Sequence, residues 1–216
     1  PSPEAFREVY DGLAEEGAEH VISIHISSTL SATLDTARLG AQMVKKAAVT
    51  VFDSRQLSLG LGFVGQCAAQ AAAAGRSLAG VLELVENLIQ RAYVFAALDT
   101  LEFLRSSGRM NGFVARLGTL LQIKPILKMY NGSPIAEKVR TTERALRRMI
   151  AWLEELAPLE QVALVHTNAA ERAEEIRLRV AHLLPQGLVP SVNVTPALGA
   201  HLGPGAVGFA VIQARR

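Results

Sequence analysis

A cluster of hydroxyl side chains follows the first strand-like segment and is the first place in the chain that could do chemistry. Ser27, Ser28 and Thr29 come after the apolar residues 21–26, and Ser31 stands at the start of a helix-like segment. In such a strand-turn-helix arrangement, free backbone N–H groups, the positive end of the helix dipole and the hydroxyls can all face a carboxylate or phosphate. The same serines could instead cap the helix, so the spacing leaves both interpretations open.

Three further side chains could contribute to an anion site. His201 lies in a His-Leu-Gly-Pro-Gly stretch, whose glycines and proline predict a tight loop that a ligand can approach closely. Arg109 follows a glycine in a polar turn, and Arg140 ends a strand-like segment, so either guanidinium could hold an anion. The alternatives are a structural histidine and two solvated surface arginines, and residue types alone leave these alternatives open.

Motifs of the common catalytic sites do not occur in the sequence. It contains no Gly-x-Ser-x-Gly, no Walker lysine motif, no His-Glu-x-x-His and no cysteine pair for zinc. Ser31, His201 and either Asp53 or Asp99 could form a triad, because triads assemble from distant residues, but nothing in the spacing favours one. These absences give no support for an enzyme, and no cofactor or metal is expected. The alternative is a serine hydrolase or a phosphoryl-transfer enzyme that uses the same anion-binding turn.

Composition limits the class of protein. Half of the 216 residues are hydrophobic and 5% are aromatic, which favours an aliphatic core in an α/β fold. The 22 basic and 20 acidic residues leave a net charge of +2, so nucleic acid is not an expected partner. The single cysteine, Cys67, cannot form an internal disulfide. No apolar run approaches the roughly 20 residues that span a bilayer, and the chain is expected to be cytoplasmic.

The elements that must position these residues alternate between helix and strand in the first part of the chain. Apolar periodicity predicts helices over residues 3–16, 34–44 and 63–74 and strands over residues 21–26 and 49–52. Such alternation is typical of a parallel sheet flanked by helices, in which ligands bind beyond the carboxyl ends of the strands. The serine turn lies at such an end.

The second part of the chain predicts a different sheet. Its predicted strands are 93–98, 126–130, 133–139, 162–166 and 206–212, with a strand-like stretch at 189–195 and an Asn-Gly hairpin turn between the second and third. The predicted helices are 78–90, 101–106, 113–121, 142–156 and 169–184. We place a domain boundary between residues 91 and 92. Residues 1–91 then form an α/β domain with a parallel sheet flanked by helices, and residues 92–216 form a second α/β domain with a mixed or antiparallel sheet.

Several short motifs occur in a specific order along nearly the whole chain. They are Ile-Ser-Ser-Thr-Leu-Ser-Ala-Thr at 26–33, Phe-Asp-Ser at 52–54, Asp-Thr-Leu-Glu-Phe-Leu at 99–104, Gly-Arg at 108–109, Leu-Gln-Ile-Lys-Pro-Ile-Leu at 121–127, Lys-Val-Arg at 138–140 and His-Leu-Gly-Pro-Gly at 201–205. In this order they resemble the DegV family of bacterial fatty-acid-binding proteins, cytoplasmic carriers that take an acyl chain to a kinase.

The resemblance implies where a fatty acid would bind. The acyl chain would lie along the first of two α/β domains, with its carboxylate near the interface between them. Ser31 would bind the carboxylate, with Ser27 and Ser28 as supporting hydroxyls, and His201 and Arg109 would border it. Arg140 would lie nearer the surface, facing a kinase partner or a phosphate.

The resemblance also sets expectations for the partner and for the start of the chain. A carrier that hands a long-chain fatty acid to a fatty acid kinase is expected to work as a monomer. The family usually has a further strand-helix segment and a Thr-Ser-Gln before the Pro-Ser-Pro with which this sequence opens. Part of the first domain, with one threonine ligand, is therefore expected to be absent from residues 1–216. A second departure is Leu-Ser-Ala-Thr at 30–33, where the family has Leu-Ser-Gly-Thr.

Overall fold

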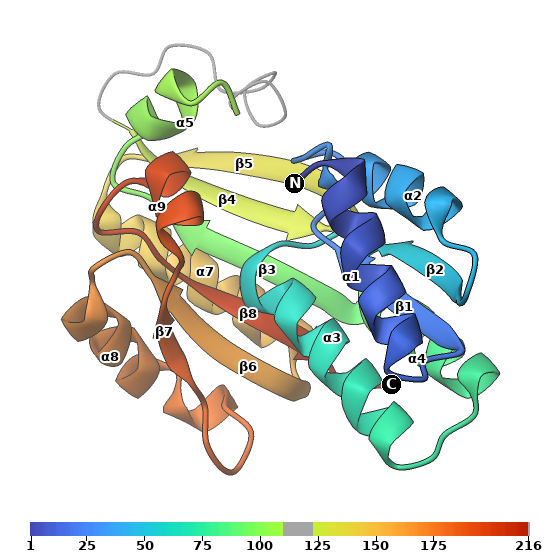
Figure 1. Ribbon diagram of the computed structural model, residues 1–216. Helices are drawn as coiled ribbons and strands as arrows, with labels where there is room; N and C mark the ends of the chain where they lie inside the picture. The colour runs from blue at the N-terminus through green and yellow to red at the C-terminus, as the bar shows by residue number, and fades with distance from the viewer. Residues whose placement is uncertain (110–122, 216) are drawn as a thin grey trace.

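Two β-sheets of different size organise the chain (Figure 1). This computed structural model describes residues 1–109 and 123–215. The smaller sheet consists of two parallel strands, β1 (His20–His25) and β2 (Ala48–Asp53). The larger sheet has six strands in the order β5-β4-β3-β8-β6-β7, in which β6 and β7 are parallel and the other neighbours are antiparallel. The predicted α/β class, with one parallel and one mixed sheet, is confirmed.

The strands of the larger sheet come from widely separated parts of the chain. They are β3 (Ala92–Ala97), β4 (Lys124–Tyr130), β5 (Ser133–Val139), β6 (Leu159–His166), β7 (Ser191–Asn193) and β8 (Val207–Gln213). β4 and β5 form the predicted hairpin, whose turn residues Asn131 and Gly132 both have positive φ angles, 46° and 76°. Asparagine and glycine tolerate this conformation, which matches the right-handed twist of the strands. β8 follows most of the chain in sequence and lies between β3 and β6.

Helices cover both sheets (Figure 1). α1 (Pro3–Glu15) and α2 (Thr33–Met43) pack on each other and on the smaller sheet. α3 (Ser58–Ala73) and α4 (Leu78–Arg91) cover one face of the larger sheet, and α7 (Thr142–Leu156) and α8 (Ala170–Arg179) cover the other. Two shorter helices, α5 (Glu102–Ser106) and α9 (Pro196–Leu202), contact each other, and a 3₁₀ turn spans Ala181–Leu183. None of the described helices is long and apolar enough to cross a membrane.

α7 shows how the sequence dictates local structure. Its N-cap residue Thr141 accepts a hydrogen bond from the backbone N–H of Arg144, which satisfies one of the free donors at the helix start. Its apolar residues recur every three or four positions, so they form one stripe that is buried against the sheet. Leu146, Met149 and Leu153 lie in this stripe, and Met149 and Leu153 are completely buried.

The alternation of side chains along β3 connects the two layers of core. Val94 faces α3 and α4 and packs in one hydrophobic cluster, whereas Phe95 and Ala97 belong to the cluster beneath α7 and α8. Successive residues of a strand point to opposite faces. The larger sheet is therefore buried on both faces, which explains why β3 and β8 read as nearly continuous apolar runs.

α3 and α4 precede the predicted domain boundary but pack on the larger sheet. Val64 of α3 and Leu88 of α4 are fully buried in the cluster that contains Val94 and Ala210 of the sheet. Ile24 of β1 packs against the same cluster from the smaller sheet. The boundary between residues 91 and 92 stays a prediction, and these helices lie between the two sheets.

The structure differs from the predicted elements at several ends. α3 begins at Ser58, ahead of the predicted start at 63, because Gly60 fits closely against Val94 and the amide of Gln56. The stretch 201–205, for which the glycines and the proline predicted a tight loop, begins inside α9, so His201 lies in a helix and the turn begins at Gly203. Pro196 starts this helix at a position where proline is favoured. The helix predicted over residues 113–121 lies outside the described residues.

Candidate functional site

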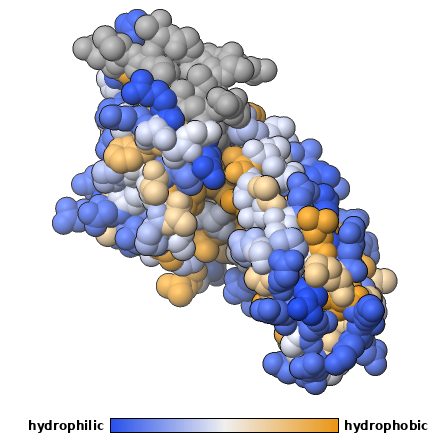
Figure 2. All heavy atoms as spheres, turned by 45° about the horizontal axis from the view of Figure 1, so that its top comes forward, coloured by the Kyte–Doolittle hydropathy of each residue, from blue (hydrophilic) through white to orange (hydrophobic). Residues whose placement is uncertain are grey.

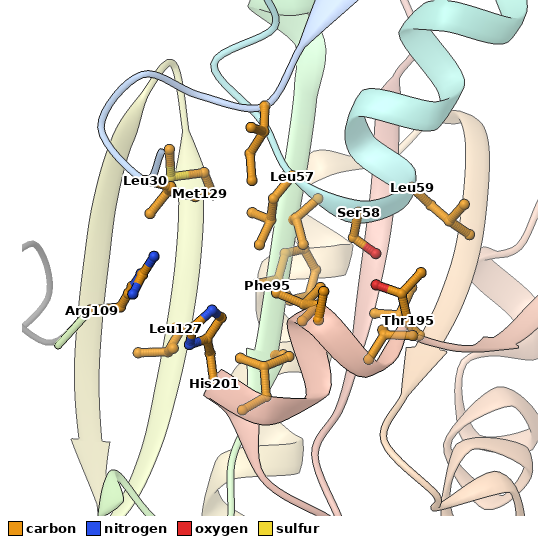
Figure 3. A pocket seen from close by; sticks show the side chains of 18 of the residues that line it. Leu30, Leu57, Ser58, Leu59, Phe95, Arg109, Leu127, Met129, Thr195 and His201 are labelled. Atoms are coloured by element: carbon orange, nitrogen blue, oxygen red, sulfur yellow. The ribbon is translucent and has the colours of Figure 1, made fainter. Parts of the chain in front are cut away.

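A cavity of about 530 Å³ lies over the larger sheet, between the loop after β1, the start of α3 and helix α9 (Figure 3). Its volume is within the range of roughly 300–1,000 Å³ that is typical of small-molecule sites. Most of its lining is aliphatic: Leu30, Leu57, Leu59, Leu127, Met129 and Leu198 all contribute. In the space-filling view, orange, white and blue residues all border the hollow near the centre of the molecule (Figure 2). The cavity is therefore suited to an apolar ligand.

Polar side chains enter this cavity on two sides. Arg109 and His201 lie close to Leu127 on one side, and Ser58 and Thr195 lie on the other (Figure 3). Ser31 also lines the cavity, next to Leu30. The structure thus brings together three of the residues that the sequence singled out, Ser31, His201 and Arg109.

His201 carries a polar atom that lacks a partner. It lies in the last turn of α9, and its Nδ1 atom is buried without a hydrogen bond to any described residue. Most buried polar side-chain atoms have a partner, and an exception is explained by strain, by a functional role or by a bound molecule. The imidazole of His201 lines the cavity, whereas its Nδ1 atom is itself inaccessible to solvent.

Thr167, the residue that follows β6, holds the turn after His201 in place. Thr167, which is 6% exposed, donates from its hydroxyl to the carbonyl of Gly203 (2.5 Å) and accepts from the N–H of Ala206 (2.9 Å). Gly203 has a φ of 75°, and a Cβ at this residue would lie 2.3 Å from the ring of Phe103. These contacts fix the end of α9, and with it the position of the imidazole.

An ion-pair cluster supports the same turn. Arg172 donates to the carbonyl of Gly205 (2.8 Å) and lies 3.4 Å from a carboxylate oxygen of Asp99. Lys124 pairs with the same carboxylate at 3.1 Å. Asp99, considered above as a possible member of a triad, therefore forms ion pairs with the side chains of Lys124 and Arg172 and packs against the turn.

Ser31 makes local hydrogen bonds and also lines the cavity. Its Oγ shares a hydrogen bond of 2.8 Å with the hydroxyl of Thr33 and accepts a second from the N–H of Thr33 (3.2 Å). These bonds lie just before α2, whose N-cap residue is Ala32 and whose start has no side-chain cap. Because Ser31 pairs with another hydroxyl and not with an imidazole, the geometry does not resemble an activated serine nucleophile.

The other two serines of the turn lie outside the cavity lining. Ser27 is completely buried and pairs with the hydroxyl of Thr29 at 3.0 Å. Ser28 is exposed and its hydroxyl donates to Asp53 (2.7 Å), the other aspartate considered for a triad. The turn is also tied to the β4–β5 hairpin, because Thr29 donates to the carbonyl of Gly132 (3.0 Å).

The two arginines differ in position. Arg109 lines the cavity and donates to the carbonyl of Ser107 (2.9 Å), which leaves guanidinium donors for a ligand. Arg140 is exposed at the end of β5 and is not part of the lining. Lys128 lines the cavity on β4, but its amine packs over the ring of Trp152 (4.8 Å) in the layer of α7, and burial lowers the pKa of this amine.

Sequence reasoning missed Ser58 and Thr195 as lining residues. Thr195 could have been found from the Thr-Pro pair, because a threonine followed by proline is typical of a helix start. Ser58 had no local signal, since it lies between the strand predicted over residues 49–52 and the helix predicted over residues 63–74. Among the described residues, no group of three or more His, Cys, Asp or Glu side chains could hold a metal ion.

Comparison with known proteins gives a match over almost the entire chain. The model of the family described as "Uncharacterised protein, DegV family" matches residues 1–214. A DegV domain-containing protein of Streptomyces coelicolor is 34% identical over 98% of this chain and 76% of its own length.

Solved structures agree with the sequence comparison. A DegV family protein from Thermus thermophilus, described with fatty-acid binding, is 34% identical with a TM-score of 0.86, over 99% of this chain and 78% of that one. DegV from Bacillus subtilis, described as a fatty acid binding protein, is 29% identical with a TM-score of 0.85, over 99% of this chain and 77% of that one.

Proposed function

Because the chain belongs to the DegV family, we propose that it binds a long-chain fatty acid in the cavity over the larger sheet and presents it to a fatty acid kinase. The observation that carries the proposal is an aliphatic cavity of about 530 Å³ that is bordered on one side by His201 and Arg109, with an unpartnered Nδ1 atom on His201. An amphipathic acid with one charged end complements this arrangement.

The hydrophobic effect supplies most of the affinity. Each methylene group that leaves water contributes about 0.8 kcal/mol. Leu57, Leu127 and Met129 offer an aliphatic surface on three sides of the cavity. Part of this gain is offset by the cost of ordering a flexible chain, so the polar end adds orientation more than affinity.

The carboxylate needs several donors to offset its lost hydration. In the proposal, the hydroxyl of Ser31 donates to it while still accepting from the N–H of Thr33, and the imidazole of His201 donates a second hydrogen bond. The guanidinium of Arg109 adds a positive charge. Ser31 comes from the predicted first domain and the other two residues from the second, so the carboxylate lies between them.

The first test is whether the purified chain carries or binds a fatty acid. Denaturing extraction followed by mass spectrometry identifies any bound acid, and titration with stearate after delipidation gives its affinity. We expect Ser31→Ala to weaken binding by about tenfold or more, because a hydrogen bond to a charged group contributes about 1.5–3 kcal/mol. The control is Ser191→Ala, an exposed serine on β7 that does not line the cavity. The proposal fails if no fatty acid is extracted and none binds.

The second part of the proposal is that the protein presents its bound fatty acid to a kinase. Arg140 is exposed at the end of β5, away from the cavity lining, where it can contact a partner or a phosphate. A fatty acid kinase with ATP should convert the bound acid to acyl phosphate. Arg140→Ala should lower this rate while the dissociation constant for stearate stays the same. No turnover with the wild-type carrier would limit the function to lipid binding.

A further inference from the structure

A second pair of polar side chains lines the cavity on the side opposite Arg109 and His201. This pair consists of Ser58, at the start of α3, and Thr195, just before α9. Figure 3 shows both hydroxyls turned toward the space between the two helices. We propose that Ser58 and Thr195 form a subsite for a hydroxyl group on the acyl chain, so that the preferred ligand is a hydroxylated long-chain fatty acid. This inference rests on the proposed function and deepens it.

Ser58 has an unusual backbone conformation. Its φ angle is 49°, in the left-handed region that residues with a Cβ rarely adopt. Such strain costs on the order of 1 kcal/mol and persists where the surrounding structure enforces it, often in a ligand site. The Ser58 hydroxyl makes no hydrogen bond to another described residue, although it lines the cavity. The strained residue thus presents a free donor and acceptor to a ligand.

Thr195 occupies a capping position without acting as a cap. A threonine at the N-cap usually accepts a hydrogen bond from a backbone N–H of the first helical turn. At the start of α9, the side chain of Thr195 makes no such bond, and its residue lines the cavity instead. Its hydroxyl is therefore available to a ligand, like that of Ser58.

The surroundings of the pair are apolar. Leu57 and Leu59 flank Ser58 in the lining, and Val194 and Leu198 lie on either side of Thr195 along the chain. A plain hydrocarbon chain that covered both hydroxyls would leave them without water or partners, which costs free energy. A ligand hydroxyl can donate to one and accept from the other, and a site built to bind such a group discriminates against the analogue that lacks it.

The absence of charge near the pair favours a neutral ligand group. Among the described lining residues, the full positive charges are those of Arg109 and Lys128. Arg109 lies on the opposite side of the cavity, and the amine of Lys128 packs over Trp152 in the layer of α7. The carboxylate is therefore expected near Arg109 and His201, and the hydroxyl of the ligand near Ser58 and Thr195.

Competition binding with positional isomers tests the subsite. Stearate and a series of hydroxystearates, with the hydroxyl at successive carbons along the chain, are titrated against the delipidated wild-type chain. One isomer, or two adjacent ones, should bind about three- to tenfold more tightly than stearate, the effect of a single hydrogen bond in a site closed to water. Ser58→Gly and Thr195→Val should each remove this preference. Glycine is chosen at 58 because it adopts a positive φ without strain.

The outcomes separate this inference from the proposed function. Equal binding of stearate and all isomers by the wild type overturns the subsite and leaves fatty-acid binding in place. A preference that survives both Ser58→Gly and Thr195→Val also overturns it. If neither stearate nor any isomer binds, the proposed function itself fails. Ser191→Ala, as control, should keep the preference of the wild type. A cooperative urea-unfolding transition for Thr195→Val, close to that of the wild type, checks that the variant still folds.

Discussion

The clamp between Thr167 and the turn after His201 leads to the sharpest prediction. Thr167→Val keeps the shape of the side chain but replaces its hydroxyl by a methyl group. Two backbone groups, the carbonyl of Gly203 and the N–H of Ala206, then lose their partner in a buried region. Each unsatisfied buried group costs roughly 1–3 kcal/mol. For the two groups together, we therefore expect the free energy of unfolding to fall by about 2–6 kcal/mol.

The same substitution should also weaken ligand binding in the cavity. Gly203 is the second residue after His201, so a loosened turn lets the imidazole move away from its place in the lining. A displacement on the order of 1 Å is enough to weaken a positioned hydrogen bond severely, and we expect stearate to bind about tenfold more weakly. Thr167→Ser keeps the hydroxyl and should restore both the stability and the affinity to nearly wild-type values.

Three measurements check the reasoning. Urea denaturation gives the free energy of unfolding, calorimetric titration gives the affinity for stearate, and NMR of the histidine side chains reports the order of the His201 ring. Sharp His201 signals in the wild type and broadened ones in Thr167→Val are expected. If the valine variant unfolds at the wild-type urea concentration and binds stearate equally well, the clamp does not position His201.

Other predictions concern stability. Burial holds the pKa of His25 below its ordinary value, so the unfolded chain binds a proton more readily than the folded one. The free energy of unfolding should therefore fall as the pH drops from about 7 to 5. Urea titrations of His25→Asn should show a smaller fall. Met149→Ala, at a fully buried position of α7, should cost about 2–5 kcal/mol, and a loss below 1 kcal/mol would contradict the described core. Thermal melts should show that Gly12→Ala, with open space around the new Cβ, stabilises α1 by up to about 1 kcal/mol, whereas Gly203→Ala destabilises the chain.

The elements that the sequence predicted best have strong local signals. The range predicted for α7 matches because a capping threonine, a regular apolar stripe and a following Ala-Pro pair all mark the same helix. The β4–β5 hairpin was found because asparagine and glycine adopt the positive φ angles that its turn requires. In both elements, residues close together in sequence are enough to predict the structure.

The predictions that missed depend on distant contacts. The predicted helix 63–74 began too late, because the lack of a side chain at Gly60 lets α3 approach Val94 of β3, a contact between residues far apart in sequence. The glycines around His201 suggested a loop, yet only Gly203 and Gly205 have positive φ angles, and the residues before them are helical. A single sequence does not show which glycine serves a turn and which serves close packing.

The sequence predicted only part of the candidate site. Ser31, His201 and Arg109 were singled out by their types, and the structure brings all three to one cavity. Ser27 and Ser28 share the same turn, but one points into the protein and the other toward Asp53. The direction of each side chain depends on backbone angles that neighbouring hydroxyls in one turn do not reveal.

The place of β8 in the larger sheet has a consequence for how the protein is made. This strand lies between β3 and β6, so the half of the sheet with β3, β4 and β5 and the half with β6 and β7 have no shared neighbour until it pairs. While the chain is being synthesised, both halves expose an unpaired edge, which favours association with other chains. The cavity has lining residues on both halves. β8 (Val207–Gln213) must therefore leave the ribosome before any ligand can find a finished pocket.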